Sequence, residues 1–234
     1  MKRFIYILLL VASCMPSLTS YAQGGPRFRF DSANPDVHDP VIAYCEGRYY
    51  IFSTGFGVGC MSSDDLKTWR PEKAVISDIP AWTREAVKGF GGHTWAPDVQ
   101  YYKGLWYLFY SCSAFGKNTS AIGLVTNKTL NPQSPDYKWE DRGLVVQSIP
   151  GTTNWNAIDP NMIIDSKGKA WLDWGSFWDG IQLAKLNDFD KPESLKDNNT
   201  RGLSTTPKTV ARRFLRSGKN KPSAADLALA NEAP

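Results

Sequence analysis

The sequence predicts an all-β fold of the β-propeller type, and two observations lead to this prediction. A unit of short strands repeats along the chain, and each repeat opens where a proline adjoins an acidic or small residue. These prolines are Pro40, Pro97 and Pro160, which stand 57 and 63 residues apart. Four antiparallel strands that recur with a period of about 50 residues or more are typical of propeller blades.

Each repeat begins with two strands joined by a tight turn. The turns pair a charged residue with glycine, at Glu46-Gly47, Lys103-Gly104 and Lys167-Gly168. Such a pair between β-branched and aromatic runs is a hairpin signal. The strands expected on either side of the three turns are residues 41–44 and 49–52, residues 99–102 and 106–110, and residues 162–165 and 170–174.

Each repeat continues into a third strand, and the first two into a fourth near Trp69 and Trp139. Helical periodicity is expected only at residues 224–230. A propeller needs about four blades or more to close its ring. We therefore expect residues 23–234 to be an incomplete propeller, cut off after about three blades. The third strands are expected near residues 58–61, 121–125 and 181–184.

Residues 1–22 are typical of an export signal, with a basic start, a short apolar run and a small-residue site before Gln23. The apolar run is too short for a permanent membrane span. The alternative is a bacterial lipoprotein signal, because residues 11–14 end in Cys14 and resemble its cleavage box. The protein is thus expected to be secreted or periplasmic, or lipid-anchored at an outer membrane through Cys14.

The formal charge of +4 includes Lys2 and Arg3 of the signal, and without them it is +2. No basic stripe remains, so the sequence gives no indication of nucleic-acid binding. The other cysteines, Cys45, Cys60 and Cys112, match no zinc pattern. We expect buried free thiols, with a Cys45–Cys60 disulfide as the alternative.

The residues next to the blade openings include four carboxylates: Asp39, Asp98, Asp159 and Glu232. The first strand of a propeller blade lies innermost, so these side chains are expected to converge on one funnel. Several carboxylates in a cleft with aromatic walls are what glycoside hydrolysis requires, and aromatic residues make up 13% of this chain. Asp98 is expected to be structural and to bond backbone amides within its blade.

Five sequence blocks then carry a resemblance to a known family. Together they resemble the signatures of the endo-1,5-α-L-arabinanases of glycoside hydrolase family 43, over about residues 35–186 and again at the last few residues. The blocks, in order, are Val37-His38-Asp39-Pro40, Thr94-Trp95-Ala96-Pro97-Asp98, Asn156-Ala157-Ile158-Asp159-Pro160-Asn161, Gly175-Ser176-Phe177-Trp178-Asp179-Gly180-Ile181 and Glu232-Ala233-Pro234.

The resemblance implies a five-bladed propeller and a hydrolase that inverts the anomeric centre. It makes Asp39 the general base, Asp159 the residue that raises the pKa of the acid, and Glu232 the general acid. Inversion places acid and base about 6.5–9.5 Å apart, with a water between them. The substrate contacts that it implies are stacking by Trp95, Phe177 and Trp178 and hydrogen bonds from His38 and Asn156.

The resemblance implies no cofactor for the chemistry, but a structural calcium ion near the propeller axis, with a histidine ligand beyond these residues. The partner is a polysaccharide, arabinan or a similar chain, and the protein is expected to be a monomer. The alternatives are an exo-acting arabinofuranosidase or xylosidase of the same family, and a non-catalytic carbohydrate-binding propeller remnant. Because the ring is expected to be open, we expect these 234 residues alone to be inactive.

Overall fold

The structure, a computed structural model, describes residues 30–175, 178–187 and 202–211. Nearly all of its regular elements are strands, which confirms the prediction of an all-β fold. The signal at residues 1–22 with Cys14, and the helical stretch at 224–230, lie outside the described residues. The elements are β1 (Val41–Cys45), β2 (Arg48–Ser53), β3 (Gly55–Phe56), β4 (Gly59–Ser63), β5 (Arg70–Pro71), α1 (Ala81–Ala86), β6 (His93–Tyr102), β7 (Leu105–Ser113), β8 (Ser120–Asn127), β9 (Glu140–Ser148), β10 (Asn161–Ile164), β11 (Ala170–Gly175), β12 (Ile181–Lys185) and β13 (Lys208–Ala211).

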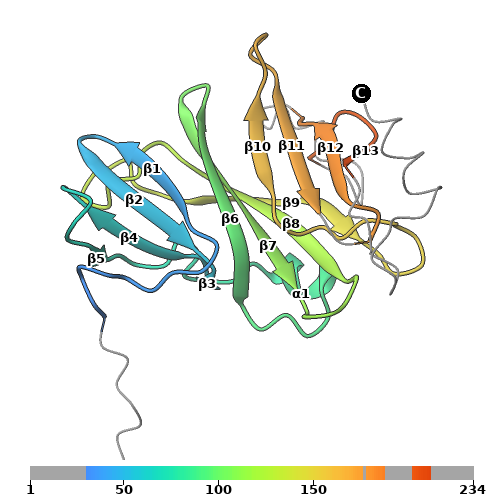
Figure 1. Ribbon diagram of the computed structural model, residues 1–234, viewed down its shortest axis with the longest axis horizontal. Coiled ribbons are helices and arrows are strands. Elements are labelled where there is room, and N and C mark those ends of the chain that lie inside the picture. Colours follow the sequence, from blue (N-terminus) through green and yellow to red (C-terminus); the bar gives the residue numbers. More distant parts are fainter. Residues whose placement is uncertain (1–29, 176–177, 188–201, 212–234) are drawn as a thin grey trace, which may run out of the picture. The chain divides into compact units, whose positions relative to one another are not determined.

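The described strands form three antiparallel sheets that follow one another along the chain (Figure 1). Their orders are β1-β2-β4-β5, β3-β6-β7-β8-β9 and β10-β11-β12-β13, and we call them the first, second and third blades. The predicted strand pairs and hairpins are confirmed: Tyr44 lies opposite Tyr49, and Tyr102 opposite Leu105. The exception is β3, which leaves the first repeat and pairs with the start of β6. Closure into five blades stays a prediction.

The second blade is buried on both faces, and this accounts for its composition. Along β7, Leu108 and Tyr110 point into the apolar cluster shared with the first blade. The alternate residues Tyr107 and Phe109 point into the cluster shared with the third blade. Because successive side chains of a strand face opposite ways, a strand with two buried faces carries neutral and mostly apolar side chains. Eight consecutive residues of β8 are accordingly buried.

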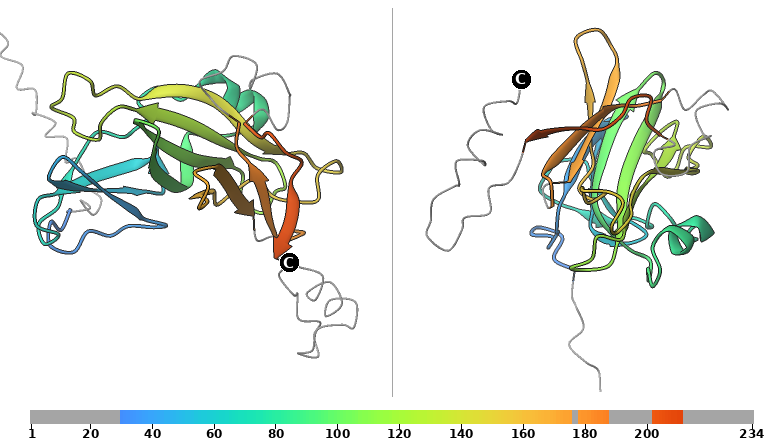
Figure 2. Two further views of the ribbon diagram at one scale, coloured as in Figure 1. Left: turned by 90° about the horizontal axis from the view of Figure 1, so that it is seen from above. Right: turned by 90° about the vertical axis from the view of Figure 1, so that its right-hand side faces the viewer.

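The short helix α1 was not expected from the sequence, and its six residues are too few to show a helical period. It begins after Pro80 and lies beside β8 and β9 (Figure 2). The Trp82 indole N–H donates to the carboxylate of Asp141 on β9, 3.1 Å away. The Trp82 ring covers Gly123 so closely that a Cβ there would lie 2.7 Å from it. Glycine at this position therefore lets the helix pack on the sheet.

The three described cysteines are buried free thiols, as the favoured interpretation had it. Burial raises the pKa of the Cys60 thiol to about 12 and that of Cys112 further still. Both groups are therefore neutral at ordinary pH and act as small apolar core residues. No described helix has the length and apolarity that a membrane crossing requires.

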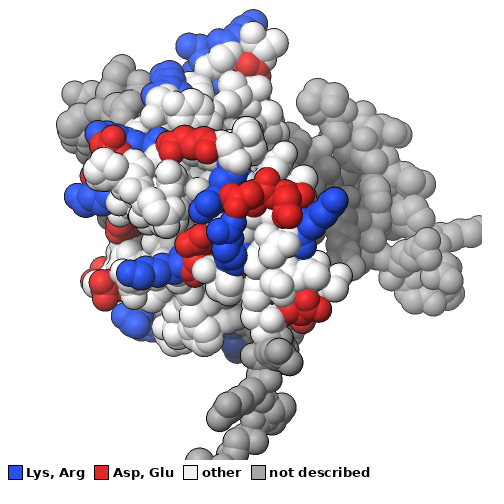
Figure 3. All heavy atoms as spheres, turned by 90° about the vertical axis from the view of Figure 1, so that its left-hand side faces the viewer, with Lys and Arg blue, Asp and Glu red and all other residues white. Residues whose placement is uncertain are grey.

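Charges of both signs mix on the face of the first blade (Figure 3). Asp64 accepts from the guanidinium groups of both Arg48 on β2 and Arg70 on β5, the two strands that flank β4 in this blade. Exposed ion pairs of this kind contribute little to stability, typically below about 1 kcal/mol. Their effect here is to break up the positive charge, so that this face presents no basic stripe.

Asp98 has a structural role, but it reaches beyond its own blade. Its Oδ2 accepts a hydrogen bond from the backbone N–H of Met162 on β10, at 2.7 Å. Burial raises the pKa of Asp98, and the backbone N–H groups of Met162 and Val99 partly counteract this rise. The carboxylate thus links the second blade to the third, where the sequence predicted bonds within the second blade alone.

Asp98→Ala should lower the free energy of unfolding by about 1–3 kcal/mol, because the N–H of buried Met162 would lose its acceptor. Asp98→Asn, which keeps an acceptor oxygen, is the matched control and should cost less than half as much. Urea unfolding of both variants measures the difference. Equal losses in the two variants would show that the hydrogen bond to the third blade does not stabilise the fold.

Asp173 on β11 faces away from the core shared with the second blade, whereas its neighbours Leu172 and Trp174 belong to that core. Burial and the nearby charge of Asp98 raise its pKa to about 6. The folded-state pKa thus lies above the ordinary value of 3.8. The folded state holds this proton more tightly than the unfolded chain does. Its contribution to stability is present at low pH and is lost as the pH rises through about 6.

Asp173→Asn should therefore stabilise the protein at pH 7.5 and leave its stability at pH 4 nearly unchanged. Asp173 is only partly buried and solvent screens its charge, so we expect a gain of about 1 kcal/mol at the higher pH. Denaturant midpoints of the wild type and the variant at both pH values test this. A gain that is the same at both pH values would contradict the linkage to the Asp173 proton.

Candidate active site

The three blade openings share an unusual backbone conformation. Asp39, Ala96 and Asp159 each precede the proline of their repeat, and each has a positive φ, of 49°, 38° and 55° respectively. The helical region is disfavoured before proline, and a positive φ strains a residue that has a Cβ. Strained residues of this kind gather at functional sites, and here they recur at one structural position of each blade.

The strained openings are tied to the second strand of a blade by backbone hydrogen bonds. The Thr54 N–H donates to the carbonyl of His38 at 3.0 Å, and the Gly175 N–H donates to the carbonyl of Ile158 at 2.8 Å. Trp95 lies opposite Ser111 in the pairing of β6 with β7. The three openings are therefore held at matching places, which supports the predicted convergence of their side chains.

Asp39 is held through one of its two carboxylate oxygens. Its Oδ2 accepts a hydrogen bond from the Thr54 hydroxyl at 2.8 Å and lies 2.6 Å from Nδ1 of His38. The described residues place no such partner on Oδ1. The Asp39 side chain is 41% exposed and that of His38 is 80% exposed. Asp39 is thus a partly exposed, oriented carboxylate whose second oxygen has no hydrogen-bond partner among the described residues.

Asp159 has the same backbone conformation but different surroundings. Its N–H donates to the hydroxyl of buried Ser111, at 3.0 Å. Burial raises the pKa of Asp159, and the charge of Asp39 raises it further. The charge of Asp39 in the first blade therefore reaches Asp159 in the third, although 120 residues separate them in the sequence. The convergence of the carboxylates on one funnel stays a prediction.

The other predicted site residues lie in varied surroundings. Trp95 is half-buried on β6, and Trp178 is 51% exposed. The backbone of Trp178 has a φ of 60° and forms an isolated bridge with Trp155. Phe177 and Glu232 lie outside the described residues. Their predicted roles, including the acid–base separation, therefore stay predictions.

Asn156 lies inside the fold and is 4% exposed. Its Oδ1 accepts from the hydroxyl of Ser120 at 2.8 Å and lies 3.3 Å from the hydroxyl of Ser148. These contacts fix the loop that leads from β9 to Asp159. The predicted hydrogen bond from Asn156 to a sugar stays a prediction, and its observed contacts are structural.

Thr54, Ser111 and Phe115 are not among the residues that the sequence patterns indicate. Thr54 and Ser111 each stand seven residues after the hairpin glycine of their repeat, at Gly47 and Gly104. An alignment of the repeats at those glycines places the two hydroxyl residues at the same position, and this is the signal that could have identified them. Phe115, in the loop between β7 and β8, is 94% exposed. A single exposed aromatic residue gives no comparable signal in the sequence.

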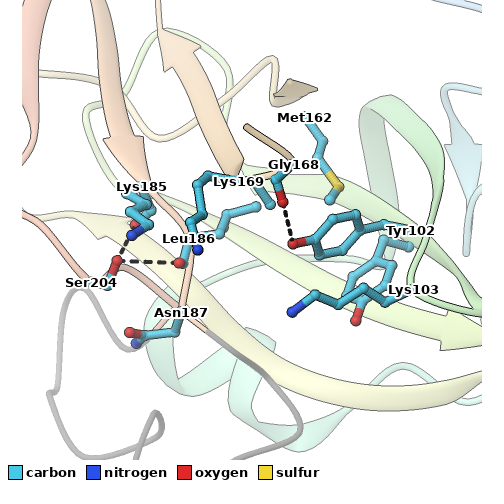
Figure 4. A pocket seen from close by; sticks show the side chains of 11 residues that line it. Tyr102, Lys103, Met162, Gly168, Lys169, Lys185, Leu186, Asn187 and Ser204 are labelled. Atoms are coloured by element: carbon cyan, nitrogen blue, oxygen red, sulfur yellow. Dashed lines mark hydrogen bonds between the residues drawn. The ribbon is translucent and has the colours of Figure 1, made fainter. Parts of the chain in front are cut away.

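A cavity of about 260 Å³ lies between the second and third blades, away from the blade openings (Figure 4). Tyr102, at the far end of β6 from Ala96, donates its hydroxyl to the carbonyl of Gly168 at 3.0 Å. Lys103, Lys169 and Lys185 also line this cavity. Because it contains none of the predicted site residues, this cavity is separate from the candidate active site.

The described residues do not form a metal centre. Neither histidine stands in a cluster with two further His, Cys, Asp or Glu side chains within the described parts of the chain. His38 contacts Asp39, and the His93 ring stands edge-on to Phe56 at 5.0 Å. The calcium ion implied by the resemblance stays a prediction, and no chemical step is derived from it.

Known proteins resemble this chain over most of its length. A relative from Cellvibrio japonicus, an extracellular exo-α-(1→5)-L-arabinofuranosidase, is 53% identical over 153 residues, which are 65% of this chain and 44% of the relative. An extracellular endo-α-(1→5)-L-arabinanase from Bacillus subtilis is 36% identical over 190 residues, covering 80% of this chain and 57% of the relative.

Among solved structures, an exo-1,5-α-L-arabinanase from a bovine ruminal metagenomic library is 60% identical, with a TM-score of 0.72. The match covers 83% of this chain and 61% of that structure. A Cellvibrio cellulosa α-L-arabinanase in complex with arabinohexaose is 46% identical, with a TM-score of 0.64, and covers 71% of this chain and 58% of that structure. The chain thus spans about half to three fifths of the length of the proteins it resembles.

The model of glycosyl hydrolases family 43 matches residues 33–211. This range contains the three blades and every candidate site residue that the structure describes. The expectation of an arabinanase-type member is confirmed by the similarity to arabinanases. The chain belongs to glycosyl hydrolases family 43.

Proposed function

We propose that the protein hydrolyses α-1,5-linked L-arabinan with inversion at the anomeric carbon. The observation that supports this most strongly is the Asp39 carboxylate, which is bound through Oδ2, has no hydrogen-bond partner on Oδ1 among the described residues, and acts through its charge on Asp159. A general base needs a fixed lone pair and room for a water molecule. The similarity to enzymes that are named for action on arabinan supports the choice of substrate.

In this proposal Asp39 accepts a proton from the attacking water, and Glu232 protonates the leaving oxygen. Asp159 raises the pKa of Glu232 and orients it. The pKa of Asp159 is itself raised by burial and by Asp39, so two charges beside one another are disfavoured at this site. Aromatic stacking of sugar rings on Trp95, Phe177 and Trp178, with hydrogen bonds from His38 and Asn156, would hold the substrate.

The proposed hydrolysis of arabinan could be exo-acting or endo-acting. The sequence identities to the named relatives favour exo action. The relatives that are 53% and 60% identical are both named as exo-acting, whereas the endo-acting relative from Bacillus subtilis is 36% identical. The two modes use the same catalytic carboxylates and differ in whether one end of the groove is blocked. The described catalytic residues are therefore compatible with both modes.

We further propose that the protein acts outside the cytoplasm. The relatives from Cellvibrio japonicus and Bacillus subtilis are both named as extracellular. The export signal predicted at residues 1–22 agrees with this, and a polymer as large as arabinan is met outside the cell. Lipid attachment at Cys14 stays a prediction.

Asp39→Asn in the full-length gene product should lower kcat/KM on linear arabinan by about 10²–10⁴-fold, because general base catalysis contributes about this much. Binding of arabino-oligosaccharides should persist, since the side chain keeps its shape. Asp36→Asn, the same change at an exposed residue nearby, should leave activity within about twofold. NMR of the first product released by the wild type should show inverted configuration at the anomeric carbon. Retained configuration, or full activity of Asp39→Asn, would refute the mechanism.

The products released early from linear arabinan should distinguish exo from endo action. An exo-acting protein releases one short sugar from the start, and the viscosity of the solution falls slowly. An endo-acting protein releases a range of oligosaccharides and lowers the viscosity at once. We expect a single early product, in line with the more similar relatives. An early mixture of lengths would establish endo action instead, and no release of arabinose or its oligomers would refute the proposed substrate.

A further inference from the structure

Thr54 contacts two blade openings at once. It follows the end of β2 and is half-buried. Its hydroxyl donates to Oδ2 of Asp39 at 2.8 Å and accepts a hydrogen bond from the backbone N–H of Ala96, also at 2.8 Å. A hydroxyl can donate one hydrogen bond and accept two. Because the Ala96 N–H can only donate, the Thr54 proton is directed at Asp39.

The comparison with the other blades shows which part of this arrangement is specific. Ser111 occupies the equivalent position in the second blade and accepts from the N–H of Asp159, just as Thr54 accepts from Ala96. In the third blade the equivalent residue is Gly175, which has no hydroxyl. Accepting from the next blade is thus common to two of these equivalent positions, whereas among the three only Thr54 also donates to a carboxylate.

We propose that Thr54 is a positioning residue for the catalytic base, an inference that rests on the proposed function. Its hydroxyl and the His38 ring both lie against Oδ2 of Asp39. Oδ1 is thereby the oxygen that receives the proton of the attacking water. Because the same hydroxyl binds Ala96, the residue after Trp95, Thr54 also sets the distance between the base and the sugar-stacking ring.

Valine matches the shape of threonine and removes only the hydroxyl, so Thr54→Val is the informative variant. We expect kcat on arabino-oligosaccharides to fall at least tenfold and KM to change less than threefold, because small misplacements of a catalytic group are costly. The loss should be the same with an aryl arabinofuranoside, since attack by water needs the base with any leaving group. Thr54→Ser, which restores the hydroxyl, should recover kcat to within threefold of the wild type.

Ser62→Ala is the matched control for losing a buried hydroxyl in the first blade. The Ser62 hydroxyl donates to Glu72, away from the blade opening, and its loss should leave kcat within twofold. If Thr54→Val behaves like Ser62→Ala, or if Thr54→Ser fails to recover kcat, Thr54 does not position the base.

A crystal structure of Thr54→Val tests the same point without relying on turnover. We expect the Asp39 carboxylate to leave its place beside His38, and in Thr54→Ser to keep it. An unmoved Asp39 in Thr54→Val would overturn the proposal. If the wild-type full-length gene product fails to hydrolyse arabinan, the proposed function fails, whereas this structural comparison still decides whether Thr54 holds Asp39.

Discussion

Burial of both faces of the second blade is the constraint on which the rest of the described structure depends. The strands β7 and β8 supply apolar side chains to the core of the first blade and to that of the third. The first and third blades are therefore fixed against a common sheet. Asp39 and Asp159, which belong to those outer blades, can interact only because the second blade sets their spacing. The apolar contacts thus determine the electrostatics of the site.

Polar contacts between the blades act at the edges of these apolar interfaces. Asp98 accepts from the backbone of Met162, Ser111 accepts from that of Asp159, and Thr54 accepts from that of Ala96. Each of these contacts joins a side chain of one blade to the backbone of the next at or beside its opening. Apolar packing is not directional, so by itself it permits small shifts of one blade relative to the next. Directed hydrogen bonds remove that freedom where the site requires accurate placement.

Much of the fold could be predicted from the sequence because the repeats keep their spacing. The glycine of each hairpin stands seven or eight residues after the opening proline, and this fixes the register of the first two strands. The helix α1 was missed because six residues hold too little periodicity, and β3 because its partner lies in another repeat. Contacts of the latter kind depend on how blades pack, which a local pattern does not encode.

The site was predictable in its carboxylates but less so in what surrounds them. Asp39 and Asp159 stand out because each precedes a proline at a blade opening. The contact of Asp98 with the third blade could not be predicted, because it joins β6 to β10 across 64 residues. Likewise, Asn156 is a polar ligand in the prediction from sequence, whereas in the fold its side-chain carbonyl oxygen contacts two serine hydroxyls. Burial decides between the two roles, and burial is a property of the packed blades.

Asp39 and Asp159 show how one backbone position can serve two chemical purposes. Both precede proline with a positive φ near 50°, so the chain presents their side chains in the same way. What differs is the solvation of the carboxyl group. Asp39 is 41% exposed and receives a hydroxyl and an imidazole on one oxygen, which suits a carboxylate that must take up a proton. Asp159 is exposed as well, but desolvation and the charge of Asp39 raise its pKa. The repeat thus sets the backbone conformation of both aspartates, and the different contacts in each blade set the properties of their carboxyl groups.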